Sequence, residues 1–166
     1  MTSADQARLH QLFEDFLERG GFPESLEVNN PKHYLRDLYS QIISRDIVSR
    51  RQIKHVKALR ELALLLFNQF SCRFTYQSLM RATGIKSINT VKNYVSFLQE
   101  AYLGFILEPY SDKVKERISL PKKFYVIDTS MANQITGTLY RNRGHRLENL
   151  VFLELNRRGF EIYSIH

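Results

Sequence analysis

The stretch FTYQSLMRATGIKSINTVKNYVSFLQEAYLG, residues 74–104, decides the fold that the sequence predicts. Thr75 can cap a short helix, because its hydroxyl can accept a hydrogen bond from the first helical turn. Gly84 stands where that helix should end, since glycine tolerates the left-handed conformation common at helix ends, and Ile85 should be a buried plug. Ser87 can cap a second helix, whose apolar residues recur at steps of three and four: Ile88, Val91, Val95, Leu98 and Tyr102. The pattern predicts a helix-turn-helix.

The opposite face of the second helix has no apolar member. A helix-turn-helix offers such a face to DNA, where short polar and cationic side chains reach bases and phosphates. The predicted DNA-contacting residues are Lys86, Ser87, Asn89, Thr90, Lys92 and Asn93. The alternative is an ordinary helical hairpin with a solvated face.

Two short apolar runs follow the helix pair and flank a polar segment. Residues 105–107 and 124–127 have the β-branched and aromatic composition of strands, and residues 111–123 between them are mostly polar. Two strands around a basic loop predict a wing. Its phosphate-contacting cations would be Lys113, Lys115 and Arg117. The glycine often found in such wings is missing, which argues against deep insertion into a groove.

Composition and charge favour a folded, basic protein of the cytoplasm. The chain has 166 residues, of which 43% are hydrophobic, and one cysteine, Cys72, which forbids an internal disulfide. The start lacks the features of a signal peptide, and the longest apolar run, residues 62–67, is too short to span a bilayer. We therefore expect a soluble cytoplasmic protein with no membrane partner.

The formal charge of +7 is distributed unevenly, because residues 1–30 carry −4 and the remainder carries +11. A basic body suits nucleic acid, since lysine and arginine displace the counterions of phosphates. The alternative is a basic protein that binds no nucleic acid.

Helices and one strand are predicted outside residues 74–127. Ser3 and Gln6 form a capping box for a first helix with a stripe of Leu9, Leu12, Phe13, Phe16 and Leu17. Later helices are predicted from Asn30-Pro31, over 52–70, after Asp128 and over 145–158, the last with Leu147, Val151, Leu155 and Phe152 buried. Residues 160–166 read as a strand, which would pair with the wing, add to a neighbour, or belong to a longer protein; we favour the longer protein.

Five motifs in order resemble the C-terminal part of bacterial and archaeal AAA+ ATPases. They are GGFPE (20–24), RDI (45–47), SINTVKNYVSFLQEAYL (87–103), PKKFYVIDTSMA (121–132) and GHRLENLVFLELNRRGFEIYSI (144–165). The resemblance implies a mainly helical α+β chain with a lid-like region (1–51), a winged helix (52–127) and the truncated start of a restriction-endonuclease-like domain (128–166). It also implies that Gly21 and Pro23 lie in a lid turn that approaches the nucleotide; a rigid turn between helices is the alternative.

The resemblance does not extend to a catalytic site. The chain has no glycine-rich loop ending in Gly-Lys-Ser/Thr and no acidic Walker B strand, so it should not hydrolyse ATP. Glu148 resembles the first carboxylate of a nuclease core, but the further carboxylates that would hold Mg²⁺ are missing. The alternative for Glu148 is an exposed or salt-bridged helix residue. We expect no enzyme activity, metal or cofactor in this chain; ATP and Mg²⁺ are implied only for the intact family protein.

Two functions from different classes follow. The first is a winged helix that binds DNA without catalysis. The second is a module for protein interaction or intramolecular gating, whose partner would be the missing N-terminal ATPase domain or another protein. A third, a free-standing transcription regulator, lacks a recognisable dimerisation helix or effector pocket.

A continuous positive stripe would favour DNA, whereas interruption by Glu100, Asp112 and Glu116, or cover by the C-terminal segment, would favour gating. The sequence leaves the oligomeric state and any DNA sequence preference open.

Overall fold

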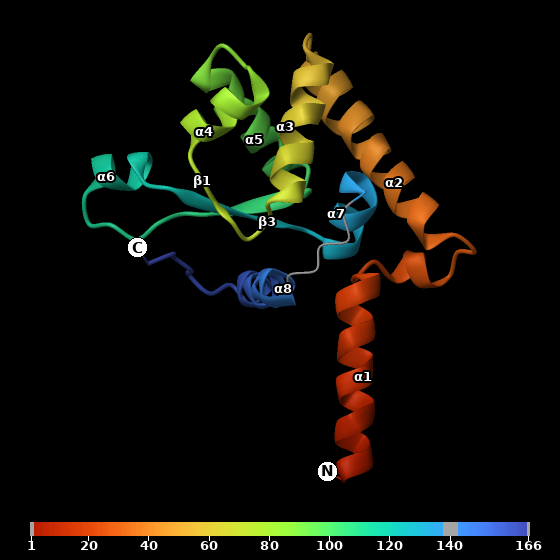
Figure 1. Ribbon diagram of the computed structural model, residues 1–166. Coiled ribbons are helices and arrows are strands. Elements are labelled where there is room, and N and C mark those ends of the chain that lie inside the picture. Colours follow the sequence, from red (N-terminus) through yellow and green to blue (C-terminus); the bar gives the residue numbers. More distant parts are fainter. Residues whose placement is uncertain (1, 138–142, 166) are drawn as a thin grey trace.

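The computed structural model describes residues 2–137 and 143–165 and has the predicted α+β class, with helices predominating (Figure 1). The strands form an antiparallel sheet in the order β1-β3-β2. The helical elements are α1 (Ser3–Arg19), η1 (Pro23–Leu26), α2 (Pro31–Gln41), η2 (Ile42–Ser49), α3 (Val56–Asn68), α4 (Tyr76–Thr83), α5 (Ile88–Glu100), α6 (Val114–Ser119), α7 (Thr129–Thr136) and α8 (Arg143–Arg157). The strands are β1 (Arg73–Phe74), β2 (Gly104–Leu107) and β3 (Lys122–Val126).

Helices α4 and α5 form the predicted pair with a tight turn. The Thr75 side chain accepts a hydrogen bond from the Ser78 backbone at 3.0 Å, and Gly84 is left-handed with φ 69°. Ser87 is the N-cap of α5, although within the described residues its side chain makes no capping hydrogen bond. Ile85 is half-buried rather than fully buried. The inclusion of Tyr102 in the apolar periodicity of the second helix was wrong, because this residue lies beyond the end of α5 with φ 56° and is 70% exposed.

Strand β3 lies between β1 and β2 and pairs antiparallel with both. It begins at Lys122, two residues before the predicted start, and the polar segment before it contains helix α6. Gly104 faces Phe124 so closely that an added Cβ would lie 2.2 Å from the phenylalanine ring. A side chain at position 104 would therefore force β2 and β3 to shift.

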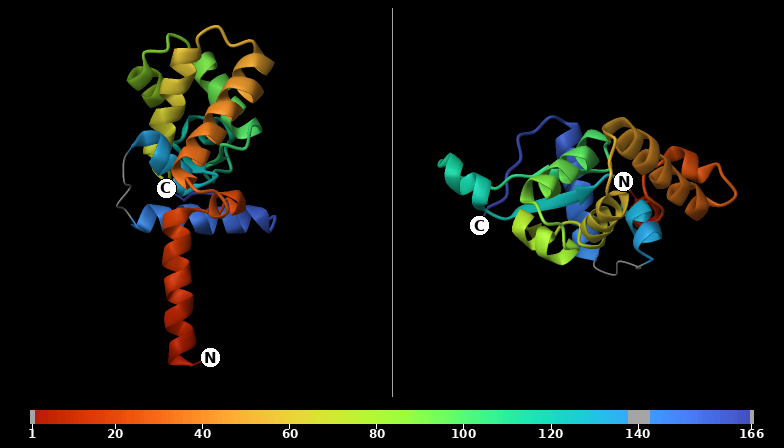
Figure 2. Two further views of the ribbon diagram at one scale, coloured as in Figure 1. Left: turned by 90° about the vertical axis from the view of Figure 1, so that its right-hand side faces the viewer. Right: turned by 90° about the horizontal axis from the view of Figure 1, so that it is seen from above.

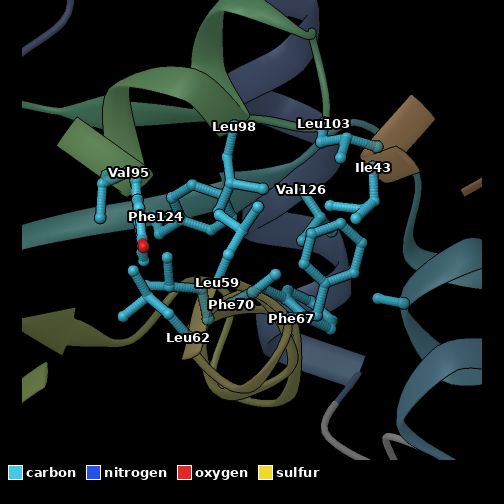
Figure 3. Close-up of a cluster of buried hydrophobic side chains, with 14 of the residues drawn as sticks. Ile43, Leu59, Leu62, Phe67, Phe70, Val95, Leu98, Leu103, Phe124 and Val126 are labelled. Atoms are coloured by element: carbon cyan, nitrogen blue, oxygen red, sulfur yellow. The ribbon is translucent and has the colours of Figure 1, made fainter. Parts of the chain in front are cut away.

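The sheet separates two apolar layers. Helices α3, α4 and α5 lie on one side of it and α8 on the other (Figures 1 and 2). Because successive strand residues point to opposite faces, Phe124 and Val126 enter the main core while Tyr125 packs with Phe152 of α8. The main core joins α2, η2, α3, α5 and β3 and includes Ile43, Leu59, Leu62, Phe67, Phe70, Val95, Leu98, Leu103, Phe124 and Val126 (Figure 3).

This main core also includes Leu35 of the predicted lid-like region (1–51) and Met131 of the predicted endonuclease-like segment (128–166). The three predicted segments thus contribute to one continuous cluster of buried side chains. Their division at residues 51 and 127 stays a prediction.

Helix α1 projects away from the rest of the molecule (Figures 1 and 2). It begins one residue earlier than predicted, because Thr2 is the N-cap and forms a capping box with Asp5. Of the predicted apolar stripe, Leu17 is buried, whereas Leu9, Leu12 and Phe16 are exposed. The periodicity correctly marks an amphipathic helix, but its apolar face is left uncovered by the described part of the chain.

The second predicted helix is capped by Asn30 and begins at Pro31 as expected, since the Asn30 side chain accepts a hydrogen bond from the His33 backbone at 3.2 Å. It continues beyond α2 as the π-helical turns of η2. The predicted third helix was too long. Gln52 has φ 50°, which an α-helix does not accommodate, so α3 starts only at Val56 and ends at Asn68.

The predicted buried side of α8 was partly wrong. Phe152 is buried as predicted and Leu155 is half-buried, whereas Leu147 and Val151 are 42% and 49% exposed and Asn149 is buried instead. The segment between the helices predicted after Asp128 and over 145–158 includes residues 138–142, which lie outside the described residues. No helix in 2–137 or 143–165 is both long and apolar enough to cross a membrane.

The strand predicted at 160–166 is not formed over residues 160–165, and His166 lies outside the described residues. One parallel bridge joins Ser164 to Pro109 there. The Ser164 backbone donates to the Glu108 carbonyl at 3.0 Å and accepts from the Tyr110 backbone at 2.9 Å. The C-terminal segment therefore lies against the chain just after β2, near the predicted wing.

Candidate nucleic-acid interface

Helix α5 presents its polar face outward, as the periodicity predicted. Residues Val91, Val95 and Leu98 are buried in the core. On the opposite side, Thr90 is half-exposed, and the exposed members of the predicted set are Lys86, Ser87, Asn89, Lys92 and Asn93. We call these six residues the polar ridge. Since its amides, hydroxyls and ammonium groups face away from the core, they can contact a partner without rearrangement of the helix pair.

The polar ridge is cationic and free of carboxylates. Residues 86–99 contain no acidic side chain, and among the described residues no carboxylate forms a salt bridge with Lys86 or Lys92. The Lys92 ammonium lies 5.5 Å from the ring centroid of Tyr76. Glu100 follows at the end of α5, where it forms an ion pair with Arg51 and accepts a hydrogen bond from Ser96 at 3.1 Å. This acidic residue is therefore neutralised.

The predicted wing cations lie on and beside α6. Lys113 precedes the helix, and Lys115 and Arg117 are exposed on it. Lys113 forms an ion pair with Glu116 at 3.0 Å; both side chains are exposed, so solvent weakens their attraction. The wing is thus less positive than its cations alone suggest.

A hollow of about 540 Å³ joins the polar ridge to the wing, and we call it the ridge–wing hollow. It is lined by Tyr76, Lys92, Glu108, Arg117, Ile118, Lys122 and Tyr163, which come from α4, α5, α6, β3 and the segments at 108 and 163. Lys122 is 5% exposed at its side chain and donates to Glu108 at 2.6 Å and to the Arg117 carbonyl at 3.1 Å. Burial, with a smaller contribution from Glu108, raises the pKa of Tyr76 to about 12. Sequence reasoning missed Tyr76, Lys122 and Tyr163.

A second basic hollow, of about 830 Å³, lies at the start of α5 and opens toward the start of α3. Lys54, Lys57 and Lys86 are among its lining residues, and Glu61 is the acidic one. Lys57 lies 3.7 Å from Glu61 in an exposed pair. The positive surface of the ridge therefore continues onto the beginning of α3.

The predicted lid turn has a structural contact of its own. The Gly21 backbone donates to Oδ2 of Asp128 at 2.7 Å, and Oδ1 of the same carboxylate accepts from the Met131 backbone at 2.7 Å. Burial raises the pKa of Asp128, and the backbone hydrogen bonds offset part of that effect. Pro23 is exposed at the start of η1. The approach of Gly21 and Pro23 to a nucleotide stays a prediction. The hydrogen bond between Gly21 and Asp128 anchors the turn.

Glu148 is bound by side chains of β3. Its Oε1 accepts from Lys123 Nζ at 2.6 Å and from the Tyr125 hydroxyl at 2.7 Å. Burial alone would raise the pKa of Glu148, but these hydrogen bonds and the Lys123 charge outweigh it and hold the pKa below its ordinary value. Across the described residues, no group of three or more His, Cys, Asp or Glu side chains is arranged to hold a metal ion. The salt-bridged reading of Glu148 thus has direct support.

Comparison with known proteins places the chain in a family of proteins without an assigned role. Residues 10–141 match the family described as "Domain of unknown function (DUF8612)", and the chain belongs to this family. It is 36% identical to "Uncharacterized protein MJ1544" of Methanocaldococcus jannaschii over 168 residues, covering 96% of this chain and 37% of that protein. It is 24% identical to an "Uncharacterized protein" of Haemophilus influenzae over 164 residues, covering 95% and 41%.

The chain therefore spans about two fifths of the length of these curated relatives. No solved structure is a significant match to it.

Proposed function

We propose that the chain is a winged helix with accessory helices that binds DNA without catalysing a reaction, as the C-terminal portion of a longer AAA+ ATPase-like protein. The observation that carries the proposal is the polar ridge, which is turned outward, cationic and free of carboxylates. The order α3-β1-α4-α5-β2-β3, with α6 between the last two strands, supports it, because a winged helix combines a helix-turn-helix with such a strand pair. In this proposal ATP and Mg²⁺ belong to another part of the intact protein.

The chemistry of the ridge suits both kinds of contact that DNA offers. Lysine neutralises phosphates and supplies affinity that depends on salt. Asparagine can hydrogen-bond both edge groups of adenine in the major groove, and lysine can do so with guanine. Asn89 and Asn93 are therefore the candidates for base contacts, whereas Lys92 on α5 and Lys115 and Arg117 on α6 are candidates for phosphate contacts.

A module for protein interaction or intramolecular gating is the second candidate function. The C-terminal segment lies against residues 108–110, Tyr163 lines the ridge–wing hollow, and Glu116 neutralises Lys113. These contacts favour gating at the wing. They leave the polar ridge itself uncovered, which is why we place DNA binding first.

A salt-titrated DNA-binding measurement tests the proposal. The variant Lys92→Glu/Lys115→Glu should weaken binding to a duplex about tenfold or more at low salt and lower the slope of log affinity against log salt by about two. A matched control is Lys32→Glu with Arg8→Glu, which makes the same charge change at exposed residues of α2 and α1. If the first variant bound DNA as tightly as the wild type, the proposal would be overturned. If both variants weakened binding equally, binding would depend on net charge alone and not on the ridge and wing.

A further inference from the structure

The ridge–wing hollow combines free cations with aromatic walls. Lys122 and Glu108 form a close ion pair that largely cancels their charges. Lys92 on α5 and Arg117 on α6 line the same hollow, and among the described residues neither forms a salt bridge. An anion held between them would therefore meet two uncompensated positive charges. Tyr76 and Tyr163 line the same space.

We propose that the ridge–wing hollow holds one unpaired nucleotide, with its phosphate between Lys92 and Arg117 and its base against the ring of Tyr163. The proposal rests on the DNA-binding function proposed above and adds a substrate class to it. The chain would prefer DNA that has a single-stranded region next to a duplex over a continuous duplex.

The volume of the hollow and the fixed position of Tyr163 support a built site. The volume of about 540 Å³ lies within the range of about 300–1,000 Å³ typical of small-ligand pockets. Tyr163 is 44% exposed, so part of its ring is accessible. The neighbouring Ser164 is bridged to Pro109, and the Ile165 carbonyl accepts from Arg73 at 2.8 Å. These bonds hold the segment that carries the ring, and the ring also packs edge-on against Tyr110 at 5.9 Å between centroids.

The aromatic wall is what points to an unpaired nucleotide. In a continuous duplex both faces of each base are covered by neighbouring bases, so only phosphates and groove edges are offered to a protein. An unpaired base has a free face, and aromatic side chains bind such faces with little dependence on sequence. Two lysines or arginines alone would hold duplex and single strand by the same phosphate contacts.

The test compares two DNA probes of equal phosphate number, a blunt duplex and a duplex with a single-stranded arm, by fluorescence anisotropy at several salt concentrations. The wild-type chain should bind the armed probe about fivefold or more tightly than the blunt one. Tyr163→Leu removes the ring but keeps an apolar side chain, and it should reduce that preference to less than about twofold. Tyr102→Leu is the matched control, since Tyr102 is exposed and does not line the hollow.

A second pair of variants addresses the phosphate. Arg117→Gln should weaken binding of the armed probe more than Lys115→Gln, because Lys115 lies on the same helix but does not line the hollow. Circular dichroism and thermal melting check that every variant is folded.

Each outcome decides the proposal. Equal affinity of the wild type for both probes, or a preference that survives Tyr163→Leu, would overturn the nucleotide site. If blunt-duplex binding then still depends on Lys92, the DNA-binding function stands without it. Absence of binding to either probe at low salt would overturn the site and the DNA-binding function together.

Discussion

The side chain of Asn149 takes the place of a strand neighbour for Val126. Its Oδ1 accepts from the Val126 backbone N–H and its Nδ2 donates to the Val126 carbonyl, both at 2.9 Å. Asn149 is fully buried, and Val126 is the last residue of β3. One amide thus satisfies both backbone groups at the end of the strand and attaches α8 to the sheet.

Replacement of this amide should therefore be costly. Asn149→Leu leaves a buried donor and a buried acceptor of Val126 without partners, and we expect it to lower the free energy of unfolding by about 2–4 kcal/mol. Denaturant unfolding measures the change. Asn156→Leu, at an exposed position of the same helix, is the control and should change stability by less than about 0.5 kcal/mol. Equal stability of the two variants would show that Asn149 does not carry this attachment.

This contact is also an example of a feature that could not be predicted from the sequence, because it joins residues that lie far apart along the chain. Local chemistry specified the α4–α5 turn, because the Thr75 cap and the left-handed Gly84 depend on a few neighbouring residues. The buried face of α8 depends on β3, which lies about twenty residues earlier along the chain. Counting apolar residues correctly selected Phe152 but also selected the exposed Leu147 and Val151, while the structure buries Asn149 because the end of a strand needs hydrogen-bond partners.

The same distinction applies to α1 and to the candidate site. Helical periodicity marked the stripe of α1 as apolar but could not specify what covers it. It did predict the polar ridge, because all six residues belong to one helix and the turn before it. Periodicity could not predict the ridge–wing hollow, since Tyr76, Lys122 and Tyr163 come from separate elements that only the tertiary fold brings together.

Asp128 predicts a specific dependence of stability on pH. Its pKa in the folded chain is raised above 3.8, chiefly by burial, so the folded state holds this proton more tightly than the unfolded state. The stabilisation from Asp128 is therefore fully present below pH 3.8 and is lost as the pH rises through the raised folded pKa.

Asp128→Asn removes this titration. It also places an amide N–H against a backbone donor, because both carboxylate oxygens accept from the backbone, and the variant should lose about 1–2 kcal/mol. The advantage of wild type over variant in unfolding free energy should shrink as the pH rises from 3 toward 7, measured by urea unfolding. An advantage that is constant over that range would contradict the assigned direction. Asp112→Asn, at an exposed residue, is the control.

Glu148 should have the opposite dependence on pH. Its pKa is held below 4.5 in the folded chain, so its stabilisation is present above pH 4.5 and is lost as the pH falls through the lowered folded value. Glu148→Gln removes the charge that Lys123 and Tyr125 bind. Because the pair is partly exposed, we expect a loss of only about 0.5–1 kcal/mol at pH 7, decreasing below pH 4.5.

Urea unfolding at a series of pH values measures this loss. The control is Glu154→Gln, which removes the partner of two solvent-exposed arginines and should hardly change the unfolding midpoint. If Glu148→Gln affected stability no more than this control at pH 7, the Lys123–Glu148 pair would not stabilise the packing of α8 on β3.

Gly20 and Gly137 both have a positive φ but differ in ψ and in crowding. Gly137 lies in the left-handed helical region with φ 67° and ψ 7°, whereas Gly20 has φ 84° and ψ −172°, a conformation essentially restricted to glycine. A Cβ at Gly20 would lie 2.3 Å from Oδ2 of Asp128, whereas a Cβ at Gly137 would meet no atom within 4 Å. Gly137→Ala should therefore cost only the strain of the left-handed backbone, about 1–2 kcal/mol. Gly20→Ala should cost more than this, because the Gly20 conformation is more strained for alanine, and it should also displace the carboxylate that holds Gly21 and caps α7. We expect Gly20→Ala to lower the unfolding free energy by about 1–3 kcal/mol more than Gly137→Ala and to speed amide exchange at Gly21 and Met131.

Denaturant unfolding and hydrogen exchange measure both effects. Equal losses for the two variants, with exchange unchanged at Gly21, would show that Asp128 does not anchor the turn after α1.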